Sequence, residues 1–112
     1  MQLIVAVIRP ERLEAVRDAL VALGVGGMTA TNARGFGRQK GQTEHYRGEA
    51  YRIRFIPKVK LEVVVQASSV SDVLGAIASA AKTGQVGDGK VFVLNVPNAL
   101  RIRTGECGVG AL

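Results

Sequence analysis

Leu3–Val7 (LIVAV) and Leu61–Val65 (LEVVV) are similar β-branched stretches that lie 58 residues apart in the chain. Short apolar runs of this composition are typical of buried strands. Each run is followed by apolar side chains at helical spacing. The second set repeats the first at an offset of 57 residues: Leu13, Val16, Leu20 and Leu23, then Val70, Val73, Ile77 and Ala80. The chain therefore contains two related strand–helix units.

A second strand completes each unit. The pattern predicts strands over 2–8, 28–34, 58–65 and 90–96, and a short final strand over Leu100–Arg103. Two βαβ halves of this kind make a ferredoxin-like βαββαβ sandwich, an α+β fold with an antiparallel sheet and both helices on one face. We expect a single domain over residues 1–112, with a long loop between the second and third strands.

The predicted strands carry more apolar residues than two helices can cover. A large uncovered apolar face marks an association surface, so we expect oligomerisation through the open face of the sheet. The residues that cannot all be hidden beneath the helices are Val5, Val7, Val63 and Val65 together with Ile4, Ile8, Leu61 and Val64.

Composition excludes several classes of protein. The chain has 112 residues and 47% hydrophobic content, which is too apolar for a disordered chain. It has no apolar run of the ~18–20 residues that a membrane helix needs, and no leader typical of secretion. The single Cys107 excludes a disulfide framework and favours a reducing compartment, so we expect a cytoplasmic protein.

Positive charge is concentrated in one segment. The net charge is +6, and eight of the 15 basic side chains lie between Arg34 and Lys60. Most of this segment is the 22-residue loop 35–56, and loops beyond ~12–15 residues are usually functional or disordered. We expect it to order on an anionic partner; the alternative is a solvated insertion without a role. The loop carries Arg38, Lys40, Arg47, Arg52 and Arg54, with Tyr46 and Tyr51.

A glycine-rich turn, Gly84–Lys90 (GQVGDGK), has the spacing of a Walker A loop. Val91 replaces the hydroxyl residue that would hold magnesium, and a strand follows instead of a helix, so an NTPase P-loop is excluded. Gly87 and Gly89 can still free backbone N–H groups for an anion, with charge from Lys90 and from Arg101 and Arg103 on the final strand. The alternative is a simple turn, with the two arginines paired to Asp88 and Glu106.

Catalytic residues do not form a recognisable set. His45 is the only histidine and lies in the long loop, where we expect it to be solvated. Cys107 has no histidine near it in the sequence and is expected to be inert. Phe36 and Phe92 are interpreted as packing residues. The pattern indicates a binding protein rather than an enzyme.

Long collinear motifs resemble the PII nitrogen-regulatory signalling proteins over essentially the whole chain. The resemblance implies a homotrimer of ferredoxin-like subunits with three nucleotide sites in the clefts between them, where ATP and ADP compete. The motifs are Gly27-Met28-Thr29, residues 35–41 (GFGRQKG), Tyr46-Arg47-Gly48, residues 55–60 (FIPKVK), Thr83-Gly84 with residues 87–92 (GDGKVF), and residues 101–106 (RIRTGE).

The resemblance divides the domain into named parts, which include the T-loop 35–56, the nucleotide-phosphate loop 82–90 and the C-terminal segment 97–112. Matching motifs also imply the residues of a nucleotide site. The residues implied for phosphate are Gly87, Gly89, Lys90, Arg101 and Arg103, with Arg38 reaching across. Those implied for the adenine and ribose region are Val7, Gly27, Met28, Thr29, Glu62, Val64 and Thr83. Gly35, Gly37, Gln39 and Asp88 complete the nucleotide set.

The resemblance also implies effectors and partners. 2-Oxoglutarate would join magnesium-ATP on Gln39, Lys40, Gly41, Lys58 and Gly87, with Gln39 facing the magnesium ion. Tyr51 matches a tyrosine that some members have nucleotidylated, and Arg47, Tyr51, Arg52 and Arg54 would contact targets. The implied function is a non-enzymatic regulator that senses ATP/ADP and 2-oxoglutarate. It would control an ammonium channel, another membrane transporter or a nitrogen-metabolism enzyme through the T-loop, and meet a membrane only through a transporter.

The T-loop departs from the family pattern. Glu49-Ala50 inverts the usual pair, Arg52 and Arg54 replace residues that are commonly apolar and acidic, and Gln42 stands where histidine is common. Outside the loop, Cys107 stands where threonine is common. These changes indicate a divergent paralogue whose target is acidic or associated with a membrane. Other open readings are a basic nucleic-acid-binding module, a small ferredoxin-like enzyme or metal-binding protein, and a relative that reads a different small anion.

Overall fold

The computed structural model describes residues 1–37 and 54–112. It contains four strands, β1 (Gln2–Ile8), β2 (Thr29–Gly35), β3 (Ile56–Val65) and β4 (Gly89–Asn95), and two helices, α1 (Leu13–Ala22) and α2 (Val70–Ala81). Single 3-10 turns precede both helices, at Pro10–Arg12 and Ala67–Ser69, and another ends the chain at Gly108–Ala111.

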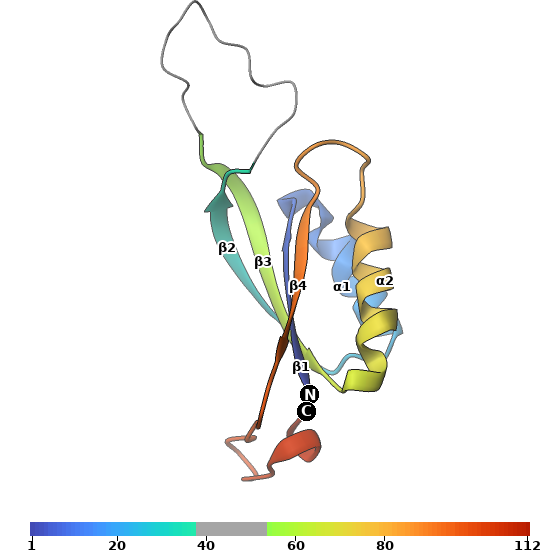
Figure 1. The fold of residues 1–112 in the computed structure, drawn as a ribbon, viewed down its shortest axis with the longest axis vertical. Helices are drawn as coiled ribbons and strands as arrows, with labels where there is room; N and C mark the ends of the chain where they lie inside the picture. The colour runs from blue at the N-terminus through green and yellow to red at the C-terminus, as the bar shows by residue number, and fades with distance from the viewer. Residues whose placement is uncertain (38–53) are drawn as a thin grey trace, which may run out of the picture.

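The sheet has the strand order β2-β3-β1-β4, and every neighbouring pair is antiparallel. Both helices lie on the same side of the sheet (Figure 1), where α1 and α2 pack on each other. The predicted ferredoxin-like βαββαβ fold is therefore confirmed. β2 ends at Gly35 and β3 begins at Ile56, so the long connection between them lies where the sequence predicts it.

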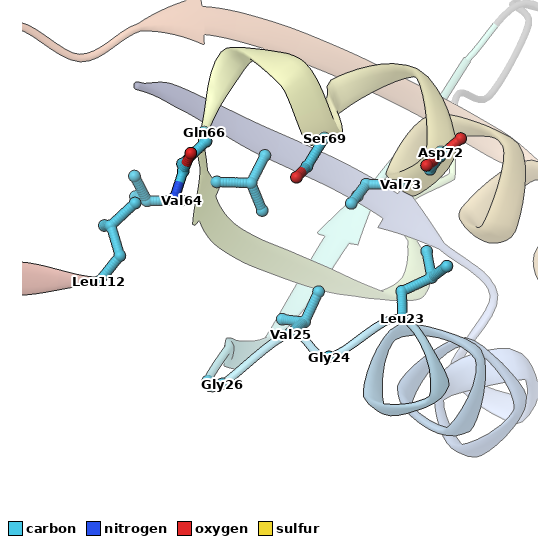
Figure 2. Close-up of a pocket in the computed structure, with 12 residues that line it drawn as sticks. Leu23, Gly24, Val25, Gly26, Val64, Gln66, Ser69, Asp72, Val73 and Leu112 are labelled. Carbon is cyan, nitrogen blue, oxygen red and sulfur yellow. The ribbon is translucent and has the colours of Figure 1, made fainter. Parts of the chain in front are cut away.

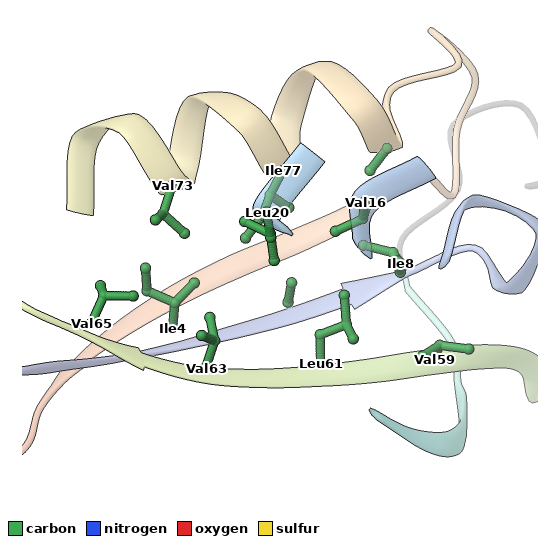
Figure 3. Close-up of a cluster of buried hydrophobic side chains, with 12 residues drawn as sticks. Ile4, Ile8, Val16, Leu20, Val59, Leu61, Val63, Val65, Val73 and Ile77 are labelled. Carbon is green, nitrogen blue, oxygen red and sulfur yellow. The ribbon is translucent and has the colours of Figure 1, made fainter. Parts of the chain in front are cut away.

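The core fills the layer between the helices and the sheet (Figure 3). It exists because alternate residues of a strand share one face, whereas residues three or four apart share one face of a helix. Burying each large aliphatic side chain stabilises the fold by about 1.5–3 kcal/mol. The buried residues are Ile4, Ala6 and Ile8 of β1, Val59, Leu61, Val63 and Val65 of β3, Val16 and Leu20 of α1, and Val73, Ile77 and Ala81 of α2.

The far face of the sheet carries apolar residues that the helices do not cover, as the sequence predicts, and the strand register decides which residues these are. Ile4 pairs with Val63 across β1 and β3, so Val63 and Val65 point toward the helices and not away from them. The reason is register, because residues paired across two strands share a face. The apolar residues on the open side are Leu3, Val5 and Val7 of β1, Val64 of β3, and the half-exposed Phe92 and Leu94 of β4.

The predicted final strand over Leu100–Arg103 is wrong. Leu100 makes only an isolated bridge with Cys107, and the chain turns over residues 102–104. The N–H of Arg101 donates to the carbonyl of Glu106 at 2.8 Å, and the N–H of Gly105 donates back to the carbonyl of Arg101 at 2.8 Å. Alternating Arg and Ile side chains resemble a strand, but the local turn takes the backbone hydrogen bonds that a sheet would use.

Within residues 1–37 and 54–112, neither helix has the length and apolar character needed to cross a bilayer.

Candidate functional site

A cleft of about 500 Å³ lies where the end of β1, the start of β3 and the loop before β4 meet. This volume is within the range of small-molecule sites. Eight of the residues predicted for ligand binding line it: Val7, Gly35, Gly37, Lys58, Gly87, Asp88, Gly89 and Lys90. Phe36, Ile56, Gln85, Val86 and Phe92 complete the wall, so the cleft has apolar sides and a glycine-rich end.

Asp88 organises the loop between α2 and β4. Its carboxylate accepts hydrogen bonds from the backbone N–H of Thr83 at 2.8 Å and of Gly84 at 2.9 Å, and from the Thr83 hydroxyl. Arg9 Nε donates a fourth, at 3.1 Å. The hydrogen bond from the Thr83 hydroxyl is the main reason that the pKa of Asp88 lies well below its ordinary value. Partial desolvation opposes this shift, and the other three donors add to it. The carboxylate is therefore an internal acceptor that closes the loop on itself.

Two cations converge on Gly87. Arg9 Nη2 donates to the carbonyl of Val86 at 2.7 Å, and Lys58 Nζ donates to the carbonyl of Gly87 at 2.6 Å. A Cβ placed on Gly87 would lie 3.3 Å from Arg9 Nη2 and 3.7 Å from Lys58 Nζ. Gly87 has a φ of 101°, which glycine adopts without strain. Both charges therefore reach the same short piece of backbone.

The electrostatic character of the cleft suits an anion. Lys58 and Lys90 line it and Arg9 reaches its loop, whereas Asp88 is the one acidic residue among the described residues of the wall. Guanidinium and ammonium groups in a partly enclosed cleft attract phosphates and carboxylates. The described ranges contain no cluster of three His, Cys, Asp or Glu side chains that would hold a metal alone.

Other predicted site residues lie away from this cleft. Gly27 and Val64 line a second cavity of about 530 Å³, between the end of α1, the start of α2 and Leu112 (Figure 2). Thr29 and Glu62 face each other across β2 and β3, and Met28 packs against the core.

Arg101 and Arg103 follow β4, which leads from the Thr83–Gly89 loop to the other end of the sheet (Figure 1). Arg101 donates to Glu106 at 3.1 Å and to the carbonyl of Leu112 at 2.9 Å. The alternative pairing of Arg101 with Glu106 is thus confirmed. The alternative pairing of these arginines with Asp88 is wrong, because Arg9 occupies that carboxylate.

The remaining predicted residues are outside the described part of the chain: Arg38, Gln39, Lys40, Gly41, Arg47, Tyr51 and Arg52. Arg54 is described and is exposed. Beside it, Phe55 meets Phe36 edge to face, with ring centres 5.2 Å apart. This aromatic contact joins the two ends of the connection between β2 and β3.

Sequence reasoning missed Arg9 and assigned Phe36 to packing. Arg9 hydrogen-bonds a loop 77 to 79 residues away, so no local pattern points to it; its position directly after the first strand was the one clue. Phe36 lines the cleft and is 56% exposed, so it belongs to the cleft wall as well as to the aromatic contact.

The structure is a small α+β ferredoxin-like sandwich with a basic, glycine-lined cleft at the base of a long connection. The family model described as "Nitrogen regulatory protein P-II" matches residues 1–106. Relatives named "Nitrogen regulatory protein P-II" include those of Rhizobium etli, 50% identical over all of both chains, and Haemophilus influenzae, 55% identical over 95% of each. "Nitrogen regulatory protein P-II 2" of Methanothermobacter thermautotrophicus is 53% identical over all of this chain and 97% of its own. The chain belongs to the P-II family of nitrogen regulatory proteins, which are signal-transduction regulators and not enzymes.

Proposed function

We propose that this regulator senses ATP and ADP, together with Mg²⁺ and 2-oxoglutarate, and passes the result to nitrogen-metabolism targets through residues 35–56. The observation that carries the proposal is the convergence of Arg9 and Lys58 on Gly87, beside Lys90 and the base of the connection between β2 and β3. A ligand in this cleft would touch the segment that leads to the target-binding surface. Linkage then requires only that the ligand prefer one arrangement of that segment.

Each cation of the cleft has a distinct role in this proposal. Lys90 and the backbone of the Gly87–Gly89 turn hold phosphate oxygens, and Lys58 holds a carboxylate of 2-oxoglutarate. Gln39 would hold the Mg²⁺ ion that accompanies the nucleotide, and the ion would neutralise phosphate charge. The described residues fit this role, because they offer cations for phosphate and no carboxylate cage for a separate metal.

The nucleotide site is completed by a second copy of the chain. Arg101 and Arg103 lie at the opposite end of the sheet from the glycine-rich turn Gly84–Lys90, called the glycine turn below. One subunit therefore cannot bring the two arginines and the glycine turn to the same phosphate chain. The open apolar face supplies a surface for association. A head-to-tail ring of three copies satisfies both requirements, because each interface joins two different surfaces and the ring closes.

The proposal is tested by calorimetric titration of the full chain with magnesium-ATP, in the presence and absence of 2-oxoglutarate. We expect micromolar nucleotide binding, equivalent to about −8 kcal/mol, and 2-oxoglutarate binding only when magnesium-ATP is present. Lys90→Gln should weaken nucleotide binding, whereas the matched Lys82→Gln, outside the cleft, should not. Absence of nucleotide binding to the wild type would refute the sensor function.

Target recognition is proposed to use the basic side chains of the loop. The exposed Arg54 stands at its described end, and with Arg47, Tyr51 and Arg52 it would suit an acidic or membrane-bound target, such as an ammonium channel or another transporter. Charge reversal by Arg54→Asp should weaken capture of the target and leave ATP affinity unchanged. Equal loss of both would show that Arg54 acts on the fold and not on the partner.

A further inference from the structure

The carbonyl groups of the glycine turn, and not its N–H groups, face the cations of the cleft. The Val86 oxygen accepts from Arg9 and the Gly87 oxygen accepts from Lys58. In a planar trans peptide the oxygen and the N–H point in opposite directions. The N–H groups of Gly87 and Asp88 share peptide units with these two oxygens, so they point away from Arg9 and Lys58. An anion cannot use Lys58 and the Asp88 N–H at once in this arrangement.

Arg9 donates hydrogen bonds to the turn on both sides of Gly87. Its Nε donates to Asp88 at 3.1 Å and its Nη2 donates to the Val86 oxygen at 2.7 Å. Asp88 is itself anchored by the N–H groups of Thr83 and Gly84, so it gives Arg9 a firm attachment point. The guanidinium group makes these two bonds from two nitrogens held in one rigid plane, whereas a lysine ammonium would have to donate both from a single nitrogen at the end of a flexible stem.

We propose that Arg9 is a positioning residue, anchored by Asp88, that holds the carbonyl of Gly87 on Lys58 and so caps this lysine until an anionic ligand displaces the carbonyl. Displacement requires the Gly87–Asp88 peptide to turn over, which exchanges its inward oxygen for an inward N–H. This rotation changes ψ of Gly87 and φ of Asp88, and Gly87 eases it because a residue without a Cβ has few sterically forbidden combinations of φ and ψ. The role of Lys58 as a ligand-binding cation rests on the proposed function; the cap itself does not.

The cap lowers the apparent affinity of the ligand. When only a fraction of the protein is in the binding-competent arrangement, the observed dissociation constant rises by the inverse of that fraction. A substitution that weakens the hydrogen bonds from Arg9 to the turn but keeps the positive charge should therefore tighten binding of a carboxylate at Lys58. A residue that contacts the ligand directly would behave in the opposite way on the same substitution.

The first experiment is titration of the magnesium-ATP-loaded full chain with 2-oxoglutarate. Arg9→Lys keeps the positive charge and removes the fork, and we expect it to bind about three- to tenfold more tightly than the wild type. Arg9→Met, which also removes the charge, should bind more weakly than Arg9→Lys. Unchanged or weaker binding by Arg9→Lys would overturn the proposal, because Arg9 would then act through its charge or by contact with the ligand.

The second experiment needs no ligand and separates the cap from the proposed function. The carbonyl ¹³C resonance of Gly87 reports its hydrogen bond, and we expect it to move upfield in Lys58→Met and in Arg9→Lys. Lys60→Met is the matched control, because Lys60 lies on the same strand and face but outside the cleft wall, and should leave the resonance in place. An unmoved Gly87 resonance in Lys58→Met would refute the cap even if nucleotide and 2-oxoglutarate bind as proposed.

Discussion

A Cβ atom on Gly89 would lie 1.8 Å from the carbonyl oxygen of Val7. Gly89 is the first residue of β4, pairs with Ile8 of β1, and has a φ of 106°. The glycine turn can enter the sheet at this point only because no side chain separates the two backbones. The same close approach places Lys90 and Val7 in one cleft wall.

Gly89→Ala is expected to lower the free energy of unfolding by about 2–4 kcal/mol, because it combines a strained φ with a backbone clash. Urea denaturation at fixed protein concentration measures the change, since any oligomer makes stability depend on concentration. Gly75→Ala is the matched control. Gly75 lies inside α2 with nothing near its Cβ position, so alanine should stabilise the helix by about 0.5–1 kcal/mol. A small effect at Gly89 would contradict the close approach.

Leu20→Ala tests the packing of α1 against the sheet. Leu20 is fully buried, and truncation should cost about 2–5 kcal/mol through lost burial and the cavity left behind. Its neighbour Val21 is 60% exposed, so Val21→Ala should change stability by less than about 0.5 kcal/mol. Comparable losses for the two variants in denaturant unfolding would show that α1 packs through a different face.

The stability of the folded chain should depend on pH through the ionisation of Asp88. The pKa of its carboxyl is lowered in the folded chain, chiefly by the Thr83 hydroxyl. A lowered folded pKa stabilises the protein fully above the ordinary Asp pKa of about 3.9, and the gain is lost as pH falls toward the lowered value. Asp88→Asn should therefore be less stable than the wild type at pH 7, with the difference shrinking below about pH 4.

Urea midpoints at pH 7, 5 and 3 measure this difference. Asp72→Asn, an exposed carboxyl in the first turn of α2, serves as the control for a general loss of negative charge. A deficit in Asp88→Asn that stays constant from pH 7 to pH 3 would mean that the loop depends on the shape of the side chain and not on its ionisation.

Mixing two inactive variants tests whether the nucleotide site spans two copies. Lys90→Gln damages the glycine-turn half of the proposed site, and Arg101→Gln damages the C-terminal half. Unfolding and refolding an equal mixture should restore about a quarter of the sites, because random assembly pairs an intact turn with an intact arginine at that frequency. Calorimetric counting of magnesium-ATP sites makes the measurement. No recovery in refolded, correctly assembled mixtures would place both halves within one chain.

Local sequence patterns were sufficient to predict most of the fold. The repeat of Leu3–Val7 in Leu61–Val65, each followed by apolar side chains at helical spacing, predicted the two βαβ units that the structure contains. Such patterns succeed because a side chain's face follows from its position in its own helix or strand. The same reasoning failed at Leu100–Arg103, where a strand-like alternation is overruled by a turn that satisfies its own backbone hydrogen bonds.

The candidate site, like the fold, was predicted from the sequence only in part. Glycine spacing and the charge of Lys90 predicted an anion-binding turn from the sequence alone, and Lys58 came from the family motif. Only the tertiary structure brought Arg9 to Asp88, turned the Gly87 carbonyl onto Lys58, and separated Arg101 from the glycine turn. These relationships join residues far apart in the chain. They depend on strand register and on the direction of single peptide units, which no local sequence pattern specifies, because each is settled only when the whole sheet has formed.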